Sequence, residues 1–317
     1  MPGGPTRPWS NSNSPSLHQD QCDSDSCVCC ESQDLESSPA LWMPFVSDMA
    51  MGLAPLRIDK SLGLVTVPDG TAYALCKSLM CRQCGHLFVD YRFSDSEMHS
   101  LYSNYRGPVY TELRDSYEPG YKERNAKISE GVPFLKEVEE FLEVFVPESG
   151  IAVLDWGGDT GINSPFRDRR SLLHIYDPSA KEAGRSDAVS FSEIPEERVQ
   201  YDLIVLSEVL EHIPFPADTL CAIRPFLTPQ TILYVEVPLE RLQVGQSGPP
   251  YSGAERKKHW HEHINFFTPR SMELLLERSG FSIAASKIFD FSGSQTEALG
   301  SSGNLLQYAC RRTNFDN

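Results

Sequence analysis

Apolar residues in the second half of the chain alternate between short continuous runs and helical spacing. Continuous runs are typical of parallel strands that helices cover on both faces. They predict strands at 151–154, 172–176, 188–191, 203–206, 231–237, 281–289 and 305–311. Helices are expected at 217–226 and 268–279, the second with Thr268 as its N-cap and Pro269 in its first turn. Because no helical segment separates the last two strands, they should pair antiparallel.

The first half has a different pattern. Residues 1–40 are rich in Ser, Pro, Asn and Asp, so we expect a disordered tail over 1–26. Short alternating segments predict small strands at 63–67, 71–75 and 86–89. Ser94 and Glu97 have the spacing of a capping box. Apolar residues at helical spacing then predict one long helix from near Pro119 to Phe145.

Composition and charge exclude several classes of protein. A chain of 317 residues fits about two domains. The net charge is −16 and no basic stripe is present, which disfavours nucleic acid as a partner. No apolar run is long enough to span a membrane, and the N-terminus lacks the apolar core of a signal peptide. We therefore expect a cytoplasmic globular protein without a membrane partner.

An acid at a strand end, followed by Gly-x-x-x-Gly, predicts a tight ligand-binding turn. Asp155 ends the first of the parallel strands, and Gly157 and Gly161 follow it. In open α/β sheets ligands bind beyond the carboxyl ends of the strands, where glycine permits close approach to the backbone. Asp177 ends the next strand and could accept two hydrogen bonds from a ribose diol. The alternatives are an ordinary glycine turn and an Asp-Pro turn.

Four segments resemble the successive motifs of class I S-adenosylmethionine (SAM)-dependent methyltransferases: VLDWGGDTG, HIYDPS, YDLIVLSEVLEHI and LYVEVP. The resemblance implies a Rossmann-like α/β fold, a seven-stranded sheet with an antiparallel last strand. It also implies that Asp155, Gly157, Gly161 and Asp177 bind SAM, with Glu208 near its amino-acid end. The family usually has Asp-x-Gly-x-Gly-x-Gly, and in this chain Asp159 replaces the middle glycine.

Nine cysteines are present and most are clustered. Cys81 and Cys84 form one Cys-x-x-Cys pair, and Cys27 and Cys30 form another upstream. Two such pairs can hold one Zn²⁺ in a tetrahedral site, which would be structural because four thiolates leave no open position. Cys22, Cys29 or Cys76 could replace an upstream ligand, and scattered reduced thiols are the alternative.

The segment 259–263 holds three histidines at alternate positions, with Glu262 between the last two. In an extended strand, His261 and His263 face one way and Glu262 the other. We predict a general base here, with His263 favoured, Glu262 orienting it or sharing the role, and His212 as a further candidate. In the deoxysugar C-methyltransferases a Glu-His pair in a similar segment is the proposed base, and Glu262 and His263 match it. A metal site and a structural loop are the alternatives.

The order of these parts is similar to that of bacterial small-molecule methyltransferases, including the deoxysugar C-methyltransferases. The predicted parts are a tail at 1–26, a zinc-binding module at 27–93, a Tyr-rich helical lid or linker at 94–146 and a methyltransferase domain at 147–317. The tyrosines either cover the active site or pack the helical stretch on the core. We expect a small-molecule acceptor, such as a sugar or secondary metabolite. A zinc-containing RNA methyltransferase and a non-catalytic binding module are the alternative functions.

Overall fold

The computed structural model describes residues 25–179, 188–195, 199–245, 248–290 and 303–313. The predicted disordered tail lies outside these residues except for its last two positions. Within the described ranges, no helix combines the length and the apolar character needed to cross a lipid bilayer.

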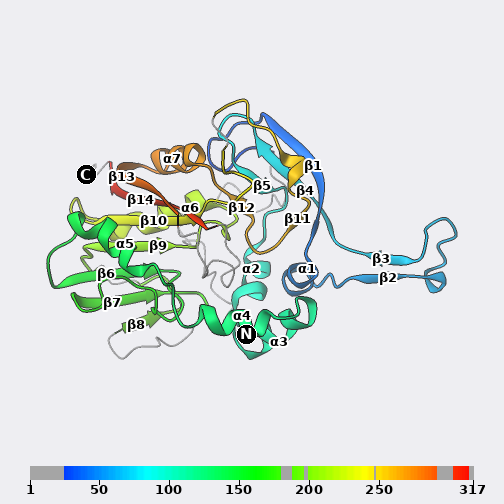
Figure 1. Ribbon diagram of the computed structural model, residues 1–317, viewed down its shortest axis with the longest axis horizontal. Coiled ribbons are helices and arrows are strands. Elements are labelled where there is room, and N and C mark those ends of the chain that lie inside the picture. Colours follow the sequence, from blue (N-terminus) through cyan, green and yellow to red (C-terminus); the bar gives the residue numbers. More distant parts are fainter. Residues whose placement is uncertain (1–24, 180–187, 196–198, 246–247, 291–302, 314–317) are drawn as a thin grey trace, which may run out of the picture.

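A seven-stranded sheet occupies one side of the described chain (Figure 1). Its order is β13-β14-β10-β9-β6-β7-β8. The bounds are β6 (Ile151–Trp156), β7 (Arg170–Tyr176), β8 (Ala188–Phe191), β9 (Leu203–Ser207), β10 (Ile232–Pro238), β13 (Phe281–Asp290) and β14 (Asn304–Arg312). Strands β6 to β10 pair in parallel, whereas β14 is antiparallel to both β10 and β13. The α/β architecture expected from the apolar runs is confirmed.

The two faces of this sheet contribute to separate apolar cores. One face packs against α5 (Leu135–Leu142), with Val138 and Val153 in the same core. The other packs against α6 (Pro216–Ile223) and α7 (Pro269–Arg278), with Leu154 and Leu276 in a second core. Successive residues of a strand point to opposite faces, so Val153 and Leu154 belong to different cores.

A second sheet has the order β11-β1-β4-β5-β12. Its strands are β1 (Leu35–Trp42), β4 (Leu75–Cys81), β5 (Leu87–Val89), β11 (His259–Trp260) and β12 (Asn265–Phe266). Strand β11 pairs in parallel with β1, and β12 pairs antiparallel with β5. The predicted division into four segments stays a prediction, but this sheet does not end at residue 93. It takes its two outer strands from 259–266.

Four further helices of the described chain precede the first strand of the seven-stranded sheet. They are α1 (Pro44–Met51), α2 (Asp95–Tyr102), α3 (Pro108–Tyr117) and α4 (Tyr121–Ile128), with short 3-10 turns at Lys60–Leu62, Glu143–Phe145, Arg224–Phe226 and Ala254–Arg256. The capping box at the start of α2 is confirmed, since Ser94 accepts from the Glu97 N–H and the Glu97 carboxylate accepts from the Ser94 N–H.

The single long helix predicted from Pro119 to Phe145 is wrong. The chain leaves helical conformation between α4 and α5, where Gly131 has a φ of +98°. Pro133 lacks an N–H and disfavours helical backbone at the residue before it. The N–H of that residue, Val132, donates instead to Asn163 Oδ1 at 2.9 Å. The apolar residues therefore keep helical spacing on both sides of a break that Gly131 and Pro133 impose on the backbone.

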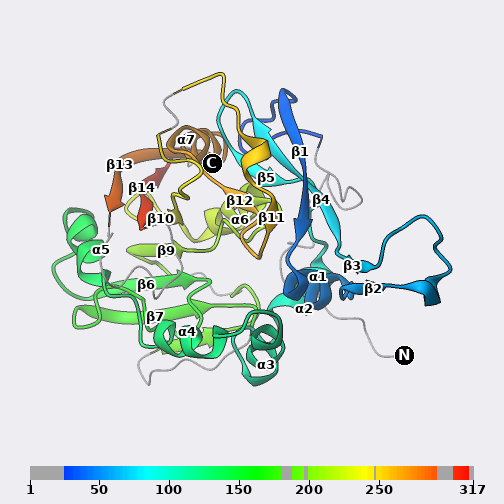
Figure 2. The ribbon, with the colours of Figure 1, turned by 45° about the vertical axis from the view of Figure 1, so that its right-hand side comes forward.

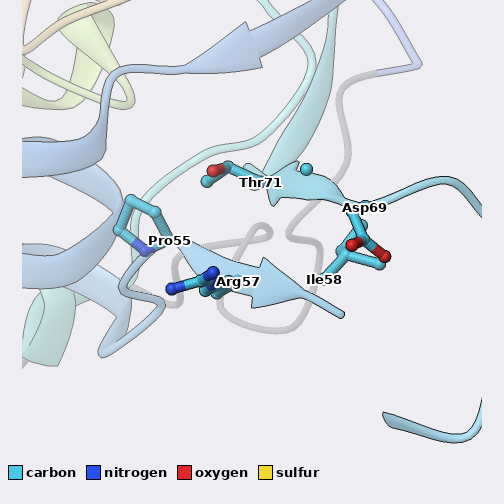
Figure 3. A pocket seen from close by; sticks show the side chains of 6 residues that line it. Pro55, Arg57, Ile58, Asp69 and Thr71 are labelled. Atoms are coloured by element: carbon cyan, nitrogen blue, oxygen red, sulfur yellow. The ribbon is translucent and has the colours of Figure 1, made fainter. Parts of the chain in front are cut away.

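A hairpin of β2 (Leu56–Ile58) and β3 (Gly70–Ala72) projects from the rest of the described chain (Figures 1 and 2). The strand predicted at 63–67 is absent, because these described residues form a turn and bends. Val65 is 97% exposed, so its side chain has no face to pack against. The side chains of Pro55, Arg57 and Thr71 line a hollow on this hairpin (Figure 3), away from the seven-stranded sheet.

Candidate functional site

Four cysteines meet at the end of β4. The sulfur atoms of Cys27, Cys30, Cys81 and Cys84 all lie within 4.8 Å of one another. Cys27 and Cys84 have their sulfurs 3.5 Å apart, and so do Cys30 and Cys81, so no disulfide joins them. A tetrahedral zinc site with bonds of about 2.3 Å needs sulfurs about 3.8 Å apart, which this group approaches. The structure therefore brings together the four predicted zinc ligands.

The other candidate cysteines are not part of this group. Cys29 and Cys76 lie outside the four, and Cys22 lies outside the described residues. The group contacts the start of α7, where the Thr268 hydroxyl donates to the Cys84 carbonyl at 2.6 Å. Arg278 at the end of α7 donates to the Cys29 carbonyl at 2.7 Å. The cysteine group is thus attached to a helix of the larger sheet.

The glycine turn follows β6 as the sequence predicts. The Gly157 N–H donates to the Tyr176 carbonyl at 2.7 Å. Gly157 has a φ of +82°, and a Cβ there would lie 2.5 Å from Val209 Cγ2, so only glycine fits without a shift. Asp159, which stands where the family has glycine, adopts left-handed backbone with a φ of +49°. Aspartate tolerates this conformation better than most residues, so the turn keeps its shape.

Two carboxylates organise this turn. Asp155 is buried and accepts from the Ser164 hydroxyl, and burial raises the pKa of Asp155 to about 6. Asp177 Oδ2 accepts from the Asp159 N–H at 2.9 Å, and its Oδ1 accepts from the Ser179 N–H at 2.8 Å. Asp177 therefore holds the glycine turn as well as facing the pocket beside it.

A pocket joins the glycine turn to the loop after β9. It is lined by Met98, Tyr102, Tyr105, Gly157, Asp177, Pro178, Ser179, Glu208, Val209, His212 and Ile213. Three of the five predicted SAM-binding residues, Gly157, Asp177 and Glu208, are among them. The other two, Asp155 and Gly161, shape the turn without lining the pocket. His212 lines the pocket, whereas His261, Glu262 and His263 of the predicted base segment do not.

His212 is held by one ring nitrogen. Its Nδ1 lies 2.9 Å from the Tyr102 hydroxyl and 3.0 Å from the carbonyl oxygen of Glu262. Burial and the nearby His263 hold the pKa of His212 well below its ordinary value. The two imidazole rings lie 4.6 Å apart, centroid to centroid. The structure therefore places the favoured base candidate, His263, beside the further candidate, His212.

His263 and Glu211 complete this group. His263 Nδ1 lies 3.4 Å from Glu240 Oε1. Burial alone would lower the pKa of His263, but the hydrogen bond to Glu240 and the charge of Glu211 raise it. Glu211 is 1% exposed, and burial raises the pKa of its carboxyl to about 7. Three groups with shifted pKa values thus meet beside the pocket.

Glu262 and His261 lie in a different network. Glu262 forms an ion pair of 2.7 Å with the buried Arg114, which also binds Glu118 at 3.1 Å. His261 Nδ1 lies 3.4 Å from Glu118 Oε1. The predicted alternation, with His261 beside His263 and Glu262 opposite, is wrong. The reason is that β11 ends at Trp260 and the chain bends at Glu262.

Sequence reasoning missed four contributors to the site. Glu211, Glu240 and Arg114 are not among the residues predicted from the sequence, in which Tyr102 is only one of a run of tyrosines. Glu211 lies within the methyltransferase-like segment after β9, so the motif itself was a usable signal. No local pattern connects Arg114 with Glu262, because that contact depends on the tertiary fold.

Comparison with known proteins identifies the family. A family model described as a methyltransferase domain matches residues 124–286, just over half of the chain. No curated protein matches the sequence. Among solved structures, the chain is similar to the 1,6-didemethyltoxoflavin-N1-methyltransferase of Burkholderia thailandensis, with 16% identity over 65% of this chain and 89% of that chain and a TM-score of 0.43.

Two further solved structures show a similar likeness. The N-methyltransferase NodS of Bradyrhizobium japonicum WM9 has 16% identity over 57% of this chain and 98% of that chain, with a TM-score of 0.39. A Haloferax volcanii complex of the Trm112 methyltransferase activator with a methyltransferase has 14% identity over 63% of this chain and 97% of that chain, with a TM-score of 0.42.

The Arg114–Glu262 pair allows a test of the Glu262 assignment. Glu262→Ala removes one partner of a buried ion pair and leaves the Arg114 charge with Glu118 alone. The free energy of unfolding should fall by about 3–5 kcal/mol, as when other buried pairs are broken. Denaturant unfolding measures it, with the exposed His259→Ala in the same segment as control. An unchanged unfolding midpoint would contradict the structural role.

Proposed function

We propose that this chain, which belongs to the methyltransferase domain family, transfers a methyl group from SAM to a small-molecule acceptor such as a sugar or secondary metabolite. One observation carries the proposal. A single pocket is lined by the glycine turn and Asp177 on one side and by Glu208 and His212 on the other. A methyltransferase needs this adjacency, because donor and acceptor must be aligned and kept from water.

The residues around the turn fit SAM. Asp177 offers carboxylate oxygens for the ribose hydroxyls, while Gly157, which lines the pocket, permits close approach of the methionine part to the backbone. Glu208 offers a carboxylate for the amino group. When bound, SAM supplies a methyl group on a sulfonium sulfur and leaves as the neutral thioether, so the acceptor must lose one proton. Asp155 supports the turn from beneath through Ser164.

The proton of the acceptor is assigned to the group formed by Glu211, His212 and His263. Glu262, which the sequence paired with His263, already neutralises Arg114 and is held away from this task. Tyr102 and Tyr105 line the same pocket and exclude water from it. His263 remains the favoured residue for the proton, now with His212 and Glu211 as its neighbours.

A small and uncharged or cationic acceptor suits the charges better than RNA does. The chain has a net charge of −16. The described residues that line the pocket include no Lys or Arg, so the pocket has no cationic side chain to pair with a phosphate backbone. This favours a small-molecule enzyme over an RNA methyltransferase. The non-catalytic alternative rested on Asp159, whose left-handed backbone keeps the turn intact.

We also propose that the four cysteines hold one structural Zn²⁺. Four thiolates fill a tetrahedral site and leave no position for a substrate. The metal would join the segment around Cys27 and Cys30 to the turn between β4 and β5. The first 34 residues contain few apolar side chains that could make this connection by packing.

Asp177→Ala should weaken SAM binding about tenfold or more, because hydrogen bonds to a charged group contribute roughly 1.5–3 kcal/mol. Isothermal titration calorimetry with SAM and with S-adenosylhomocysteine measures the affinity. The exposed Asp168→Ala serves as a matched control and should bind as wild type. Wild-type affinity in Asp177→Ala would remove the ribose assignment.

Untargeted mass spectrometry with a metabolite extract and isotopically labelled SAM should reveal a product that gains one methyl group. With that acceptor, His263→Ala should lower turnover about 10²–10⁴-fold, the usual contribution of a positioned proton acceptor. SAM affinity should barely change, since His263 does not line the pocket beside the glycine turn. His259→Ala is the control. Undiminished turnover in His263→Ala would shift the role to His212.

Metal analysis of freshly purified protein should find one zinc per chain. Cys81→Ser should lose the metal and lower the melting temperature, whereas Cys76→Ser, outside the group, should keep both. A folded, monodisperse wild-type protein without metal would refute the zinc proposal.

A further inference from the structure

Three side chains beside the pocket offer ligand atoms to a common point. One oxygen of Glu211 and one nitrogen each of His212 and His263 lie within 4.8 Å of one another. His212 Nε2 is 3.8 Å from Glu211 Oε1. Ligands of one metal ion at bond lengths of about 2.0–2.2 Å must lie within about 4.4 Å of each other, so small side-chain adjustments close the site.

Both histidines are oriented as metal ligands are in proteins. His212 uses Nδ1 toward the Glu262 carbonyl at 3.0 Å, and His263 uses Nδ1 toward the Glu240 carboxylate at 3.4 Å. A metal-binding histidine typically donates its other ring N–H to a carbonyl or carboxylate, which fixes the ring and the tautomer. In both rings this leaves Nε2 as the atom with a lone pair to offer.

Glu211 supplies an independent observation. Its side chain is 1% exposed, and neither carboxylate oxygen has a hydrogen-bond partner among the described residues. Buried carboxylates are otherwise paired, hydrogen-bonded or bound to metal, because burying an unpaired charge is costly. Burial and the charge of Glu211 hold the pKa of the neighbouring Glu208 well above its ordinary value, and Glu240 adds a further carboxylate near Glu211. A cation bound beside Glu211 would satisfy these oxygens.

We propose that Glu211, His212 and His263 bind one divalent metal cation beside the pocket, and that the acceptor reacts through a hydroxyl group that binds this cation. The donor set of two imidazoles and a carboxylate suits Mn²⁺, Fe²⁺ or Zn²⁺, and three protein ligands leave positions open for substrate. The part about the acceptor rests on the proposed function, whereas metal binding can be tested without it.

A cation here explains how an unactivated hydroxyl loses its proton at neutral pH. Contact with a divalent cation stabilises the oxygen anion. The three side chains then act on the proton through the cation that they hold and do not accept it themselves: the O–H bond breaks and its proton passes to water. The oxygen then bonds to the transferred methyl carbon, as the carbon–sulfur bond breaks and its electron pair stays on sulfur. No oxidation or reduction takes part.

Mn²⁺ is the probe, because its electron paramagnetic resonance signal reports free and bound ion and the cysteine group prefers zinc. Zinc-loaded wild-type protein should bind one Mn²⁺ per chain. Glu211→Gln and His263→Ala should each weaken binding about 100-fold or more. Glu240→Gln, which removes only the orienting carboxylate, should weaken it about 10–100-fold. His259→Ala, an exposed histidine of the same segment, should bind as wild type.

The outcomes separate this proposal from the proposed function. Absence of bound Mn²⁺ in the wild type, or unchanged binding in His263→Ala, overturns the metal site. Should Glu211→Gln fail to fold, His263→Ala still decides, because that side chain is 33% exposed. Full methyl transfer after removal of all divalent ions other than the cysteine-bound zinc also overturns it, yet leaves the function intact. Binding of Mn²⁺ without binding of SAM would support the metal site and overturn the proposed function.

Discussion

The buried side chain of Asn265 joins the two sheets of the protein. Its Nδ2 donates to the carbonyls of Leu210 at 3.0 Å and Ile213 at 2.7 Å, in the loop after β9. Its Oδ1 accepts from Arg92 at 2.8 Å, just beyond β5. A fully paired amide with 1% exposure is costly to disturb, since any lost partner leaves a buried polar group unsatisfied. The position of the loop after β9 relative to β12 and the chain just beyond β5 is therefore fixed.

That constraint produces the site. The N–H groups of Ile264 and Asn265 both donate to the Glu211 carbonyl, at 2.7 and 3.0 Å, so the segment before β12 lies across the loop that follows β9. His263 consequently reaches His212, although 51 positions separate them in the chain. The segment then continues to Thr268, which binds the Cys84 carbonyl. The segment from His263 to Thr268 thus connects the cysteine group with the pocket, and loss of the cysteine group should loosen the pocket.

The sequence predicts those parts of the structure that depend on local pattern. Parallel strands are apolar on both faces, so their positions from Ile151 onward follow from continuous runs, and a left-handed turn follows from the spacing of its glycines. The long helix failed because periodicity outweighed Gly131 and Pro133, which break it. The orientation of Glu262 could not be predicted, because it is decided by Arg114 in a distant helix. The exposure of Glu211 likewise depends on the loops that Asn265 fixes.

The tyrosines of the helical stretch between β5 and β6 divide between two roles, covering the active site and packing on the core. Tyr102 and Tyr105 line the pocket, and the Tyr102 hydroxyl reaches His212. Tyr110 and Tyr121 are instead buried at 0% and 3% exposure, where the Arg114 guanidinium lies 4.2 Å from the Tyr121 ring. The same Arg114 pairs with Glu262, so the packed tyrosines and the bend before His263 depend on one charge. Packing of the later tyrosines thereby holds the earlier two over the pocket, and one helical stretch serves both purposes.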